Sequence, residues 1–342
     1  MLEPIDVAVL GATGVVGETM ISILEKRKFP IRNLYALASE NTAGKILFFN
    51  NKRIMVEDAS TFDFSKVKIG LFSAGGDVSE IYAPKAAAAG CIVIDNTSKF
   101  RYINEIPLVV PEVNPECIAQ YVNKNIIANP NCSTIQMLVA LKPIYDAVGI
   151  EKIHVATYQA VSGTGRQAIS ELAAQTGELL NGRPIESKVY PHQIAFNVIP
   201  HIDAFQDNGF TKEEMKMVWE TQKILGDPNI SISATAVRIP VFYGHSEAVH
   251  IEMTKPLSAK DARKLLSTAP GIEVIDEPKK ASYPTPVTHA TGTDPVYVGR
   301  IRNDIDNEKA LNLWIVSDNI RKGAALNSVQ IAEILLSKYI SL

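Results

Sequence analysis

Short apolar runs alternate with helical or turn segments over the first third of the chain. The apolar runs predict strands at Ile5–Leu10, Asn33–Ala38, Lys68–Phe72, Cys91–Asp95, Leu108–Val110 and Ile126–Ala128. Between them, Val15–Lys26 has the spacing of an amphipathic helix, and the alanine-rich run Pro84–Ala89 predicts a short helical fragment. This alternation is typical of a doubly wound, mainly parallel sheet.

Beyond residue 132 the apolar and polar positions alternate over longer segments. They predict strands at Lys152–Gln159, Ser231–Ile239, Ala248–Met253 and Leu311–Val316, and helices at Arg166–Leu180, Lys212–Leu225 and Ala259–Leu266. Long strands with long connections favour a mixed or antiparallel sheet with helices on one face. We therefore expect an α/β protein with a Rossmann-like doubly wound domain over residues 1–130 and an α+β domain over 131–321. We expect the C-terminal segment, 322–342, to pack back on the first domain.

Composition and charge limit the classes of function. The 342 residues carry a net charge of −3 with dispersed lysines and arginines, which argues against nucleic-acid binding. No apolar run is long enough to span a bilayer, and the first residues lack the pattern of a signal peptide, so we expect no membrane association. The three cysteines, Cys91, Cys117 and Cys132, show no metal-like pairing. They predict a reducing compartment, the cytoplasm, and no metal site.

A glycine-rich turn joins the first strand to the first helix. The run Gly11-Ala12-Thr13-Gly14-Val15-Val16-Gly17 lets a pyrophosphate approach the backbone, and the helix N-terminus favours its charge. The alternative is a turn that only packs a helix closely on a sheet. We expect cofactor contacts from this turn and from a second loop after a later strand; the residues are Gly11, Thr13, Gly14, Val15, Val16, Gly17 and Ser73.

Cys132 lies between a strand-like segment and an apolar stretch that predicts a buried helix, which Pro143 should end or kink. At a helix N-terminus, unpaired N–H groups and the macrodipole lower the pKa of a thiol toward the reactive thiolate. The same N–H groups can stabilise an oxyanion on a carbonyl that the sulfur attacks. A small core cysteine is the alternative interpretation.

Four motifs together resemble aspartate-semialdehyde dehydrogenases. They are the glycine-rich turn, Asn129-Pro130-Asn131-Cys132-Ser133-Thr134, Gln159-Ala160-Val161-Ser162-Gly163-Thr164-Gly165, and Val237-Arg238-Ile239-Pro240 followed by His245-Ser246-Glu247. The resemblance runs from near residue 5 to near residue 335, in the family's order. It implies a catalytic and dimerisation domain like that of glyceraldehyde-3-phosphate dehydrogenase, and at least a homodimer, with a tetramer as the alternative.

The resemblance also implies the chemistry. Cys132 would attack 4-phospho-L-aspartate and release phosphate, and the nicotinamide would reduce the thioester to L-aspartate 4-semialdehyde, in the pathway to lysine, threonine and methionine. His245 matches the acid/base, a role that suits an imidazole pKa near about 6.5. Alternatives are a reductase acting on N-acetylglutamyl phosphate or glyceraldehyde 3-phosphate, and a dinucleotide sensor without catalysis.

The remaining matches concern the substrate and cofactor. Arg238 corresponds to the residue that binds the α-carboxylate, and Gln159 to one that orients the substrate. Arg101 and Lys223 correspond to phosphate-site residues and Glu220 to a contact of the substrate amine, although Glu220 and Lys223 at i, i+3 could form a helix-surface ion pair. Ser162, Gly163 and Asn319 correspond to positions at the nicotinamide end.

One departure from the family concerns the cofactor. NADP-preferring members commonly place Arg-Ser where this chain has Asn41-Thr42, and Glu40 beside them would repel a 2′-phosphate. We therefore expect NADP as the cofactor, with weaker discrimination against NAD.

Overall fold

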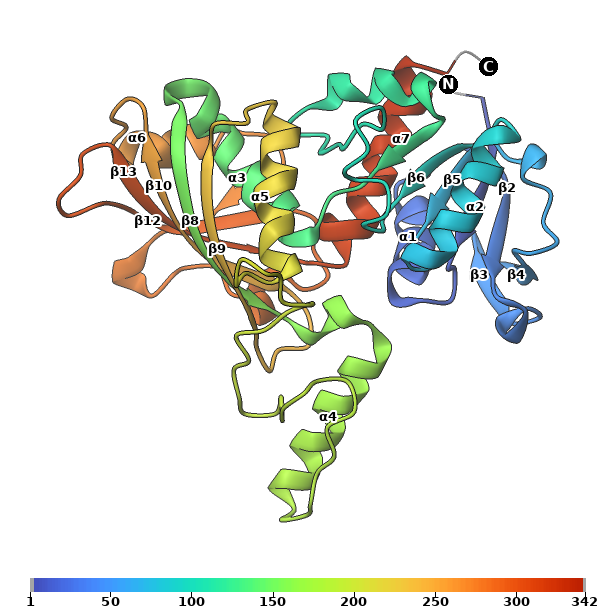
Figure 1. Cartoon of the computed structure of the whole chain (residues 1–342), viewed down its shortest axis with the longest axis horizontal. Coiled ribbons are helices and arrows are strands. Elements are labelled where there is room, and N and C mark those ends of the chain that lie inside the picture. Colours follow the sequence, from blue (N-terminus) through green and yellow to red (C-terminus); the bar gives the residue numbers. More distant parts are fainter. Residues whose placement is uncertain (1–2, 341–342) are drawn as a thin grey trace. The chain divides into compact units, whose positions relative to one another are not determined.

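The computed structural model describes residues 3–340 and divides them into two compact units. The first unit holds the described residues up to Asn131 together with those from Ala324 onward, and the second holds Cys132–Gly323. Figure 1 labels their helices and strands.

A seven-stranded sheet forms the first unit. Its strands are β1 (Ile5–Leu10), β2 (Ile31–Ala38), β3 (Ile46–Phe49), β4 (Lys52–Asp58), β5 (Ile69–Phe72), β6 (Ile92–Asp95) and β7 (Ile126–Ala128). They lie in the order β3-β4-β2-β1-β5-β6-β7, and every pair except β3 with β4 is parallel. The predicted doubly wound sheet is confirmed. Because the strand order reverses between β1 and β5, a ligand crevice is expected at their carboxyl ends.

Three helices cover this sheet: α1 (Val15–Lys26), α2 (Gly76–Ala88) and α7 (Leu326–Lys338). The helix α1 connects β1 to β2, and α2 connects β5 to β6, so the two connections run in opposite directions along the sheet. Because such connections are right-handed, α1 and α2 lie on opposite faces. Met20, Ile23 and Leu24 of α1 have the i, i+3, i+4 spacing of a buried face, and they share a core with Val329 and Leu335 of α7. This core includes apolar side chains of the central strands.

Two predictions in this unit were inaccurate. Leu108–Val110 forms only a single bridge, between Leu108 and Ala128, because the Asn114 side chain bonds the backbone of this segment at both ends. The predicted helical fragment at 84–89 is the last part of α2, which begins at Gly76 and accommodates Pro84 internally. The edge hairpin of β3 and β4 was not predicted at all.

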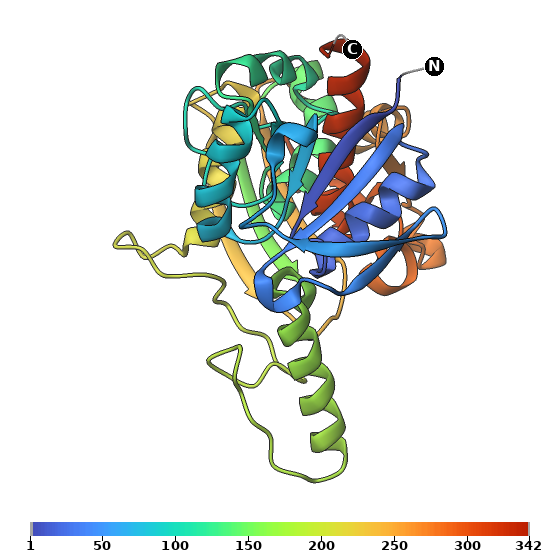
Figure 2. The ribbon, with the colours of Figure 1, turned by 90° about the vertical axis from the view of Figure 1, so that its right-hand side faces the viewer.

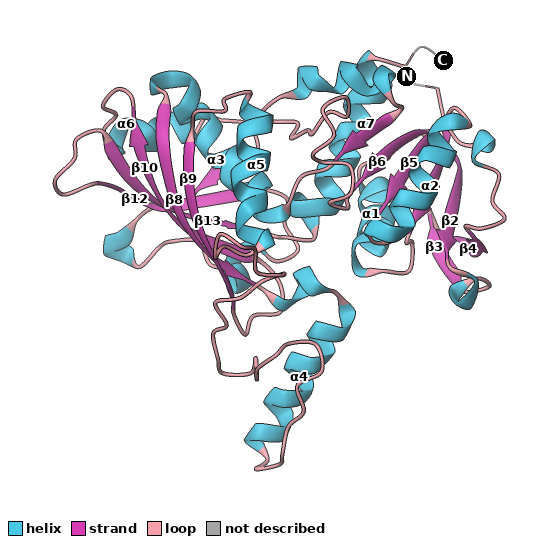
Figure 3. Cartoon of the chain, viewed as in Figure 1, coloured by secondary structure: helices cyan, strands magenta, loops and turns pink. Residues whose placement is uncertain are grey.

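A six-stranded mixed sheet forms the second unit. Its strands are β8 (Ile150–Gln159), β9 (Ser231–Arg238), β10 (His245–Met253), β11 (Ile272–Val274), β12 (Val296–Asn303) and β13 (Ala310–Ser317), in the order β11-β12-β13-β10-β8-β9. The helices α3 (Cys132–Val148), α5 (Lys212–Leu225) and α6 (Ala259–Leu266) cover one face, as predicted (Figure 3). Pro143 does not end α3, which continues to Val148.

The other helix of this unit, α4 (Arg166–Leu180), has the predicted bounds. With the irregular segment that follows it, α4 extends away from the six-stranded sheet (Figures 1 and 2). Among residues 3–340, no helix is both long and apolar enough to cross a membrane.

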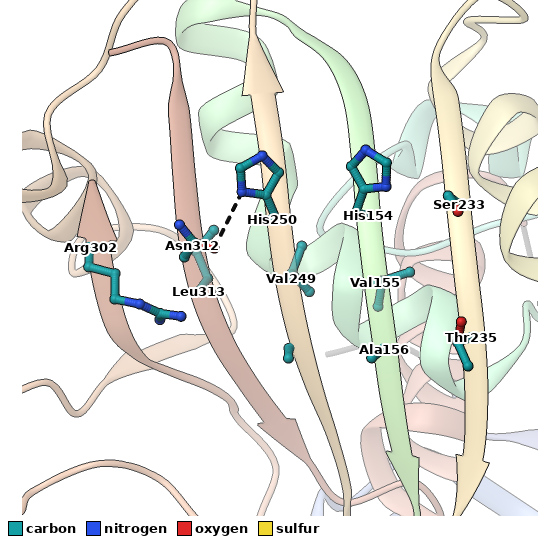
Figure 4. A pocket seen from close by; sticks show the side chains of 11 residues that line it. His154, Val155, Ala156, Ser233, Thr235, Val249, His250, Arg302, Asn312 and Leu313 are labelled. Atoms are coloured by element: carbon teal, nitrogen blue, oxygen red, sulfur yellow. Dashed lines mark hydrogen bonds between the residues drawn. The ribbon is translucent and has the colours of Figure 1, made fainter. Parts of the chain in front are cut away.

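The sheet face opposite α3 carries small and polar side chains from β8, β9, β10 and β13 (Figure 4). His154 and His250 are paired across β8 and β10, and they border a shallow hollow of about 340 Å³. None of the residues lining this hollow is a predicted site residue.

Candidate functional site

Cys132 is the first residue of α3, and its side chain is half-buried. The predicted position at a helix N-terminus is therefore confirmed. Gly323 packs directly against it, because a Cβ added at Gly323 would lie 2.7 Å from the Cβ of Cys132. The other cysteines lie in environments that disfavour a thiolate. Burial raises the pKa of the Cys91 thiol to about 12, and burial followed by the Glu116 charge raises that of Cys117.

His245 is the first residue of β10 and is completely buried. Gly244 before it has φ +89°, a left-handed conformation that glycine adopts without strain, so the chain can turn sharply just before His245. The Nδ1 atom of His245 accepts a hydrogen bond from the backbone N–H of Ala160 at 3.0 Å. Burial, and next the positive charge of Arg238, lower the pKa of the imidazole to about 3. The expectation of a pKa near 6.5 was therefore wrong, because the ring is out of water and beside a cation.

Arg238, the last residue of β9, contacts Ala160, the residue whose N–H also binds His245. Its Nη1 donates to the carbonyl oxygen of Ala160 at 2.7 Å, and its guanidinium carbon lies 5.8 Å from the ring centroid of Tyr190. The strands β8 and β9 run parallel with Gln159 in register with Arg238, which explains why the residue after Gln159 meets this side chain. A buried arginine requires such partners.

Asn319 links two loops of the same site. Its Oδ1 accepts from the hydroxyl of Ser162 at 3.1 Å and from the backbone N–H of Gly244 at 2.9 Å. Gly163 follows Ser162, and a Cβ there would lie 3.3 Å from Nη1 of Arg238 and 3.4 Å from Nε2 of His245. The structure thus brings together these predicted residues of the second unit around the loop at Gly163.

Three buried donor or donor-capable atoms of this group have no hydrogen-bond partner within residues 3–340. They are Nε of Arg238, Nε2 of His245 and Nδ2 of Asn319. Because buried polar atoms in native proteins are nearly always paired, such a set indicates a place for a ligand rich in acceptor oxygens. Carboxylate, carbonyl and carboxamide oxygens meet that requirement.

Gln159 is oriented by residues that sequence reasoning missed. Its Oε1 accepts from Thr157 at 2.9 Å, and its Nε2 donates to Glu213 at 3.1 Å. Glu213 in turn pairs with Lys216 at 2.9 Å, although both lie on α5 at a spacing typical of a surface ion pair. Nothing in the local pattern distinguishes this buried pair from an exposed one.

The predicted phosphate-site residues belong to different units. In the first, Arg101 is buried and donates to the carbonyl oxygens of Asn129 and Asn96, each at 2.9 Å. In the second, Glu220 on α5 is completely buried and Lys223 is half-buried. The interpretation of Glu220 as part of a solvated helix surface was therefore wrong.

The glycine-rich turn has the geometry of a dinucleotide-binding loop. A Cβ at Gly17 would lie 2.2 Å from the carbonyl oxygen of Gly11, and one at Gly11 would lie 2.9 Å from the backbone nitrogen of Ala74. Gly14, the N-cap residue of α1, has no side chain that could bond the first backbone N–H groups of the helix, which suits a bound anion. The residues present therefore fit a pyrophosphate. Asn41 and Thr42 lie in the short helical turn Glu40–Thr42 after β2, with Asn41 and Glu40 exposed.

Comparisons with known proteins agree with this geometry. Residues 6–121 match the family model for the semialdehyde dehydrogenase NAD binding domain, and residues 141–322 match that for the semialdehyde dehydrogenase dimerisation domain. The chain therefore uses a nicotinamide dinucleotide and forms oligomers. Among the residues that the structure describes, no cluster of histidine, cysteine and acidic side chains could hold a metal ion.

Relatives similar over nearly the whole chain show the family. An aspartate-semialdehyde dehydrogenase of Shewanella violacea is 63% identical over 99% of this chain and 100% of its own length. The crystal structure of aspartate semialdehyde dehydrogenase II from Vibrio cholerae, complexed with ASA, is 58% identical with a TM-score of 0.97, covering 99% of this chain and 100% of that one. A Candida albicans aspartate semialdehyde dehydrogenase with NADP is 27% identical with a TM-score of 0.77, covering 97% and 98%. This chain is thus an oxidoreductase, and it belongs to the aspartate-semialdehyde dehydrogenase family.

Proposed function

We propose that this chain catalyses the reversible, NADP-dependent reductive dephosphorylation of 4-phospho-L-aspartate to L-aspartate 4-semialdehyde. The observation that carries the proposal is the double use of Ala160, whose N–H binds His245 and whose carbonyl oxygen binds Arg238. Around that residue, three buried atoms lack partners within the described residues and suit a small, oxygen-rich substrate.

Cys132 is the proposed nucleophile. Its thiolate attacks the acyl carbon, the bond to the phosphate oxygen breaks, and inorganic phosphate leaves from a thioester. The reduced nicotinamide, when bound, supplies the hydride that converts the thioester into a thiohemiacetal oxyanion. The oxyanion then re-forms its carbonyl group and expels the Cys132 thiolate. The α3 N-terminus favours this anion at the start and end of the cycle.

His245 is proposed to stabilise the oxyanion. Because Nδ1 accepts from Ala160, the neutral ring carries its proton on Nε2, and Nε2–H is a hydrogen-bond donor. Collapse of the oxyanion to the aldehyde requires no proton from the ring, so a fixed donor is sufficient. The acid/base role predicted from the sequence would require the ring to release the Ala160 N–H.

The other predicted residues are assigned to the substrate. Arg238 binds the α-carboxylate, Gln159 orients the reacting acyl group and Glu220 contacts the amine. Arg101 and Lys223 hold the phosphate before and after it leaves. The buried Nε of Arg238, which has no hydrogen-bond partner within residues 3–340, supports the assignment of this side chain to the α-carboxylate.

The cofactor is proposed to be NADP, with NAD also accepted. The glycine-rich turn (Gly11, Thr13, Gly14, Val15, Val16 and Gly17) and Ser73 would hold the pyrophosphate. Asn41 and Thr42 would contact the 2′-phosphate, and Ser162, Gly163 and Asn319 the nicotinamide end. The unpartnered Nδ2 of Asn319 supports a carboxamide acceptor there.

The assembly is proposed to be at least a homodimer formed through the second unit, in the cytoplasm, in the pathway to lysine, threonine and methionine. The sheet face opposite α3, where His154, Ser233 and Thr235 are exposed, supports this interface (Figure 4), as does the match of residues 141–322 to a dimerisation domain. Thr235, exposed on that face, provides a test. In sedimentation experiments, Thr235→Arg should be a monomer. The control Thr61→Arg, at an exposed threonine of the first unit, should remain an oligomer. If both variants remained dimers, this interface would be rejected.

The catalytic proposal is tested by phosphate-dependent reduction of NADP with L-aspartate 4-semialdehyde, N-acetylglutamate semialdehyde and glyceraldehyde 3-phosphate. Only the first should turn over, and Cys132→Ala should abolish the reaction. Inactivation by a thiol reagent, with protection by substrate and phosphate, separates an enzyme from a dinucleotide sensor. Turnover of another aldehyde in place of the first would overturn the substrate assignment.

A further inference from the structure

Tyr190 lies against the predicted carboxylate-binding arginine, although no motif marks it. It belongs to the irregular segment after α4, and its side chain is 8% exposed. Its ring centroid is 5.8 Å from the guanidinium carbon of Arg238, within the range of a cation–π contact. Its hydroxyl donates to Oγ1 of Thr164 at 3.1 Å, next to the loop of Ser162 and Gly163.

Hydrogen bonds to Glu171 fix the backbone that carries this ring. The Glu171 carboxylate on α4 accepts from the backbone N–H groups of Lys188 at 2.8 Å, Val189 at 2.6 Å and Tyr190 at 3.4 Å. Three convergent N–H groups around one buried carboxylate fix a segment that has no helix or strand of its own.

Gln175, one helical turn after Glu171, fixes the same segment further along. Its Oε1 accepts from the N–H groups of Ile194 at 3.0 Å and Ala195 at 3.2 Å. The backbone that carries Tyr190 is therefore held between two anchors on one helix, and neither anchor involves Arg238.

We propose that Tyr190 is a positioning residue for Arg238, and that it sets the affinity for the α-carboxylate; this inference rests on the proposed function. An arginine side chain has many rotamers, and binding a carboxylate with two N–H groups requires one orientation. Ala160 fixes one nitrogen of the guanidinium through Nη1, and the aromatic face restricts its plane. The two contacts leave the buried Nε without a partner within the described residues.

The test compares Tyr190→Phe with Tyr190→Leu. Phenylalanine keeps the aromatic face and loses only the bond to Thr164, so its KM for L-aspartate 4-semialdehyde should stay within about twofold of the wild type. Leucine removes the face, and that KM should rise about three- to thirtyfold, the range of a cation–π contact. The KM for NADP should not change. If the leucine variant is unstable by thermal unfolding, Tyr190→Met carries the same comparison.

A second substrate separates positioning of Arg238 from a general structural role. 3-Aminopropanal has the aldehyde and amine but lacks the α-carboxylate, so kcat/KM for it should be the same in the wild type and Tyr190→Leu. An equal loss with both aldehydes, or no loss with either, would overturn the inference. Failure of the wild type to oxidise L-aspartate 4-semialdehyde would instead overturn the proposed function.

Discussion

Ala160 donates its backbone N–H to Nδ1 of His245 at 3.0 Å, and this single bond determines which nitrogen of the ring carries the proton. The proton must be on Nε2, because a nitrogen that accepts a hydrogen bond is unprotonated. The ring is therefore a hydrogen-bond donor toward the loop at Gly163, where Nε2 has no partner within residues 3–340.

This tautomer predicts how His245 variants behave. Glutamine offers an uncharged N–H donor, whereas leucine offers none, so His245→Gln should retain a kcat at least about tenfold higher than His245→Leu. The measurement is steady-state kcat of both variants with saturating substrates. Equal losses of about a hundredfold or more in both variants would show that proton transfer, and not donation, is the role of the ring.

Burial of His245 also predicts a dependence of stability on pH. The imidazole pKa is 6.5 in the unfolded chain and about 3 in the folded one. Below pH 6.5 the unfolded chain binds a proton that the folded chain does not, so the free energy of unfolding should fall as the pH falls from 6.5 toward 3. In urea unfolding at about pH 7 and about pH 5, His245→Gln should lose less stability than the wild type. Equal losses would contradict a neutral, buried ring.

The packing of Gly323 on Cys132 predicts a strong local effect of one methyl group. In Gly323→Ala the new Cβ would lie 2.7 Å from the Cβ of Cys132, so the thiol must move. We expect kcat to fall by about a hundredfold, the cost of a displacement near 1 Å. Gly177→Ala on α4 is the matched control, because its Cβ meets nothing within 4 Å. Comparable activity of the two variants would mean that this contact does not position the sulfur.

The turn after β2 predicts a modest cofactor preference. Asn41 and Thr42 bring no positive charge to a 2′-phosphate, and Glu40 adds a negative one. The ratio of kcat/KM for NADP over NAD should therefore stay below about a thousandfold and rise about tenfold in Asn41→Arg, as expected for one added ionic contact of about 1.4 kcal/mol. Lys45→Arg keeps the local charge and should leave the ratio unchanged. A wild-type preference of a thousandfold or more would refute the prediction.

The periodic elements of both units could be predicted from the sequence. Val15–Lys26, Arg166–Leu180, Lys212–Leu225 and Ala259–Leu266 form helices with the predicted bounds, because apolar periodicity and polar flanks agree there. The short apolar run Leu108–Val110 likewise predicts a strand. It fails as one because the Asn114 side chain, four residues beyond Val110, takes the hydrogen bonds that a neighbouring strand would make.

The chemistry of the site was less accessible to sequence reasoning. The motifs identify Cys132, Arg238 and His245. The pKa of His245, however, depends on its burial and on the charge of Arg238, which the strand geometry brings close to the ring. Glu247 gives a second case. It is completely buried on β10, and this burial raises its pKa well above the ordinary value, although the neighbouring side chain of Gln136 opposes the shift. Its pattern in the sequence is that of an ordinary polar strand residue.

Acylation of Cys132 can be observed in a single-turnover experiment without phosphate. With NADP and L-aspartate 4-semialdehyde, the enzyme should release one equivalent of NADPH per subunit and then stop. Mass spectrometry should locate an aspartyl group on Cys132, and added phosphate should remove it. A burst without an adduct, an adduct on Cys91 or Cys117, or a full burst in Cys132→Ala would show that Cys132 is not the residue acylated.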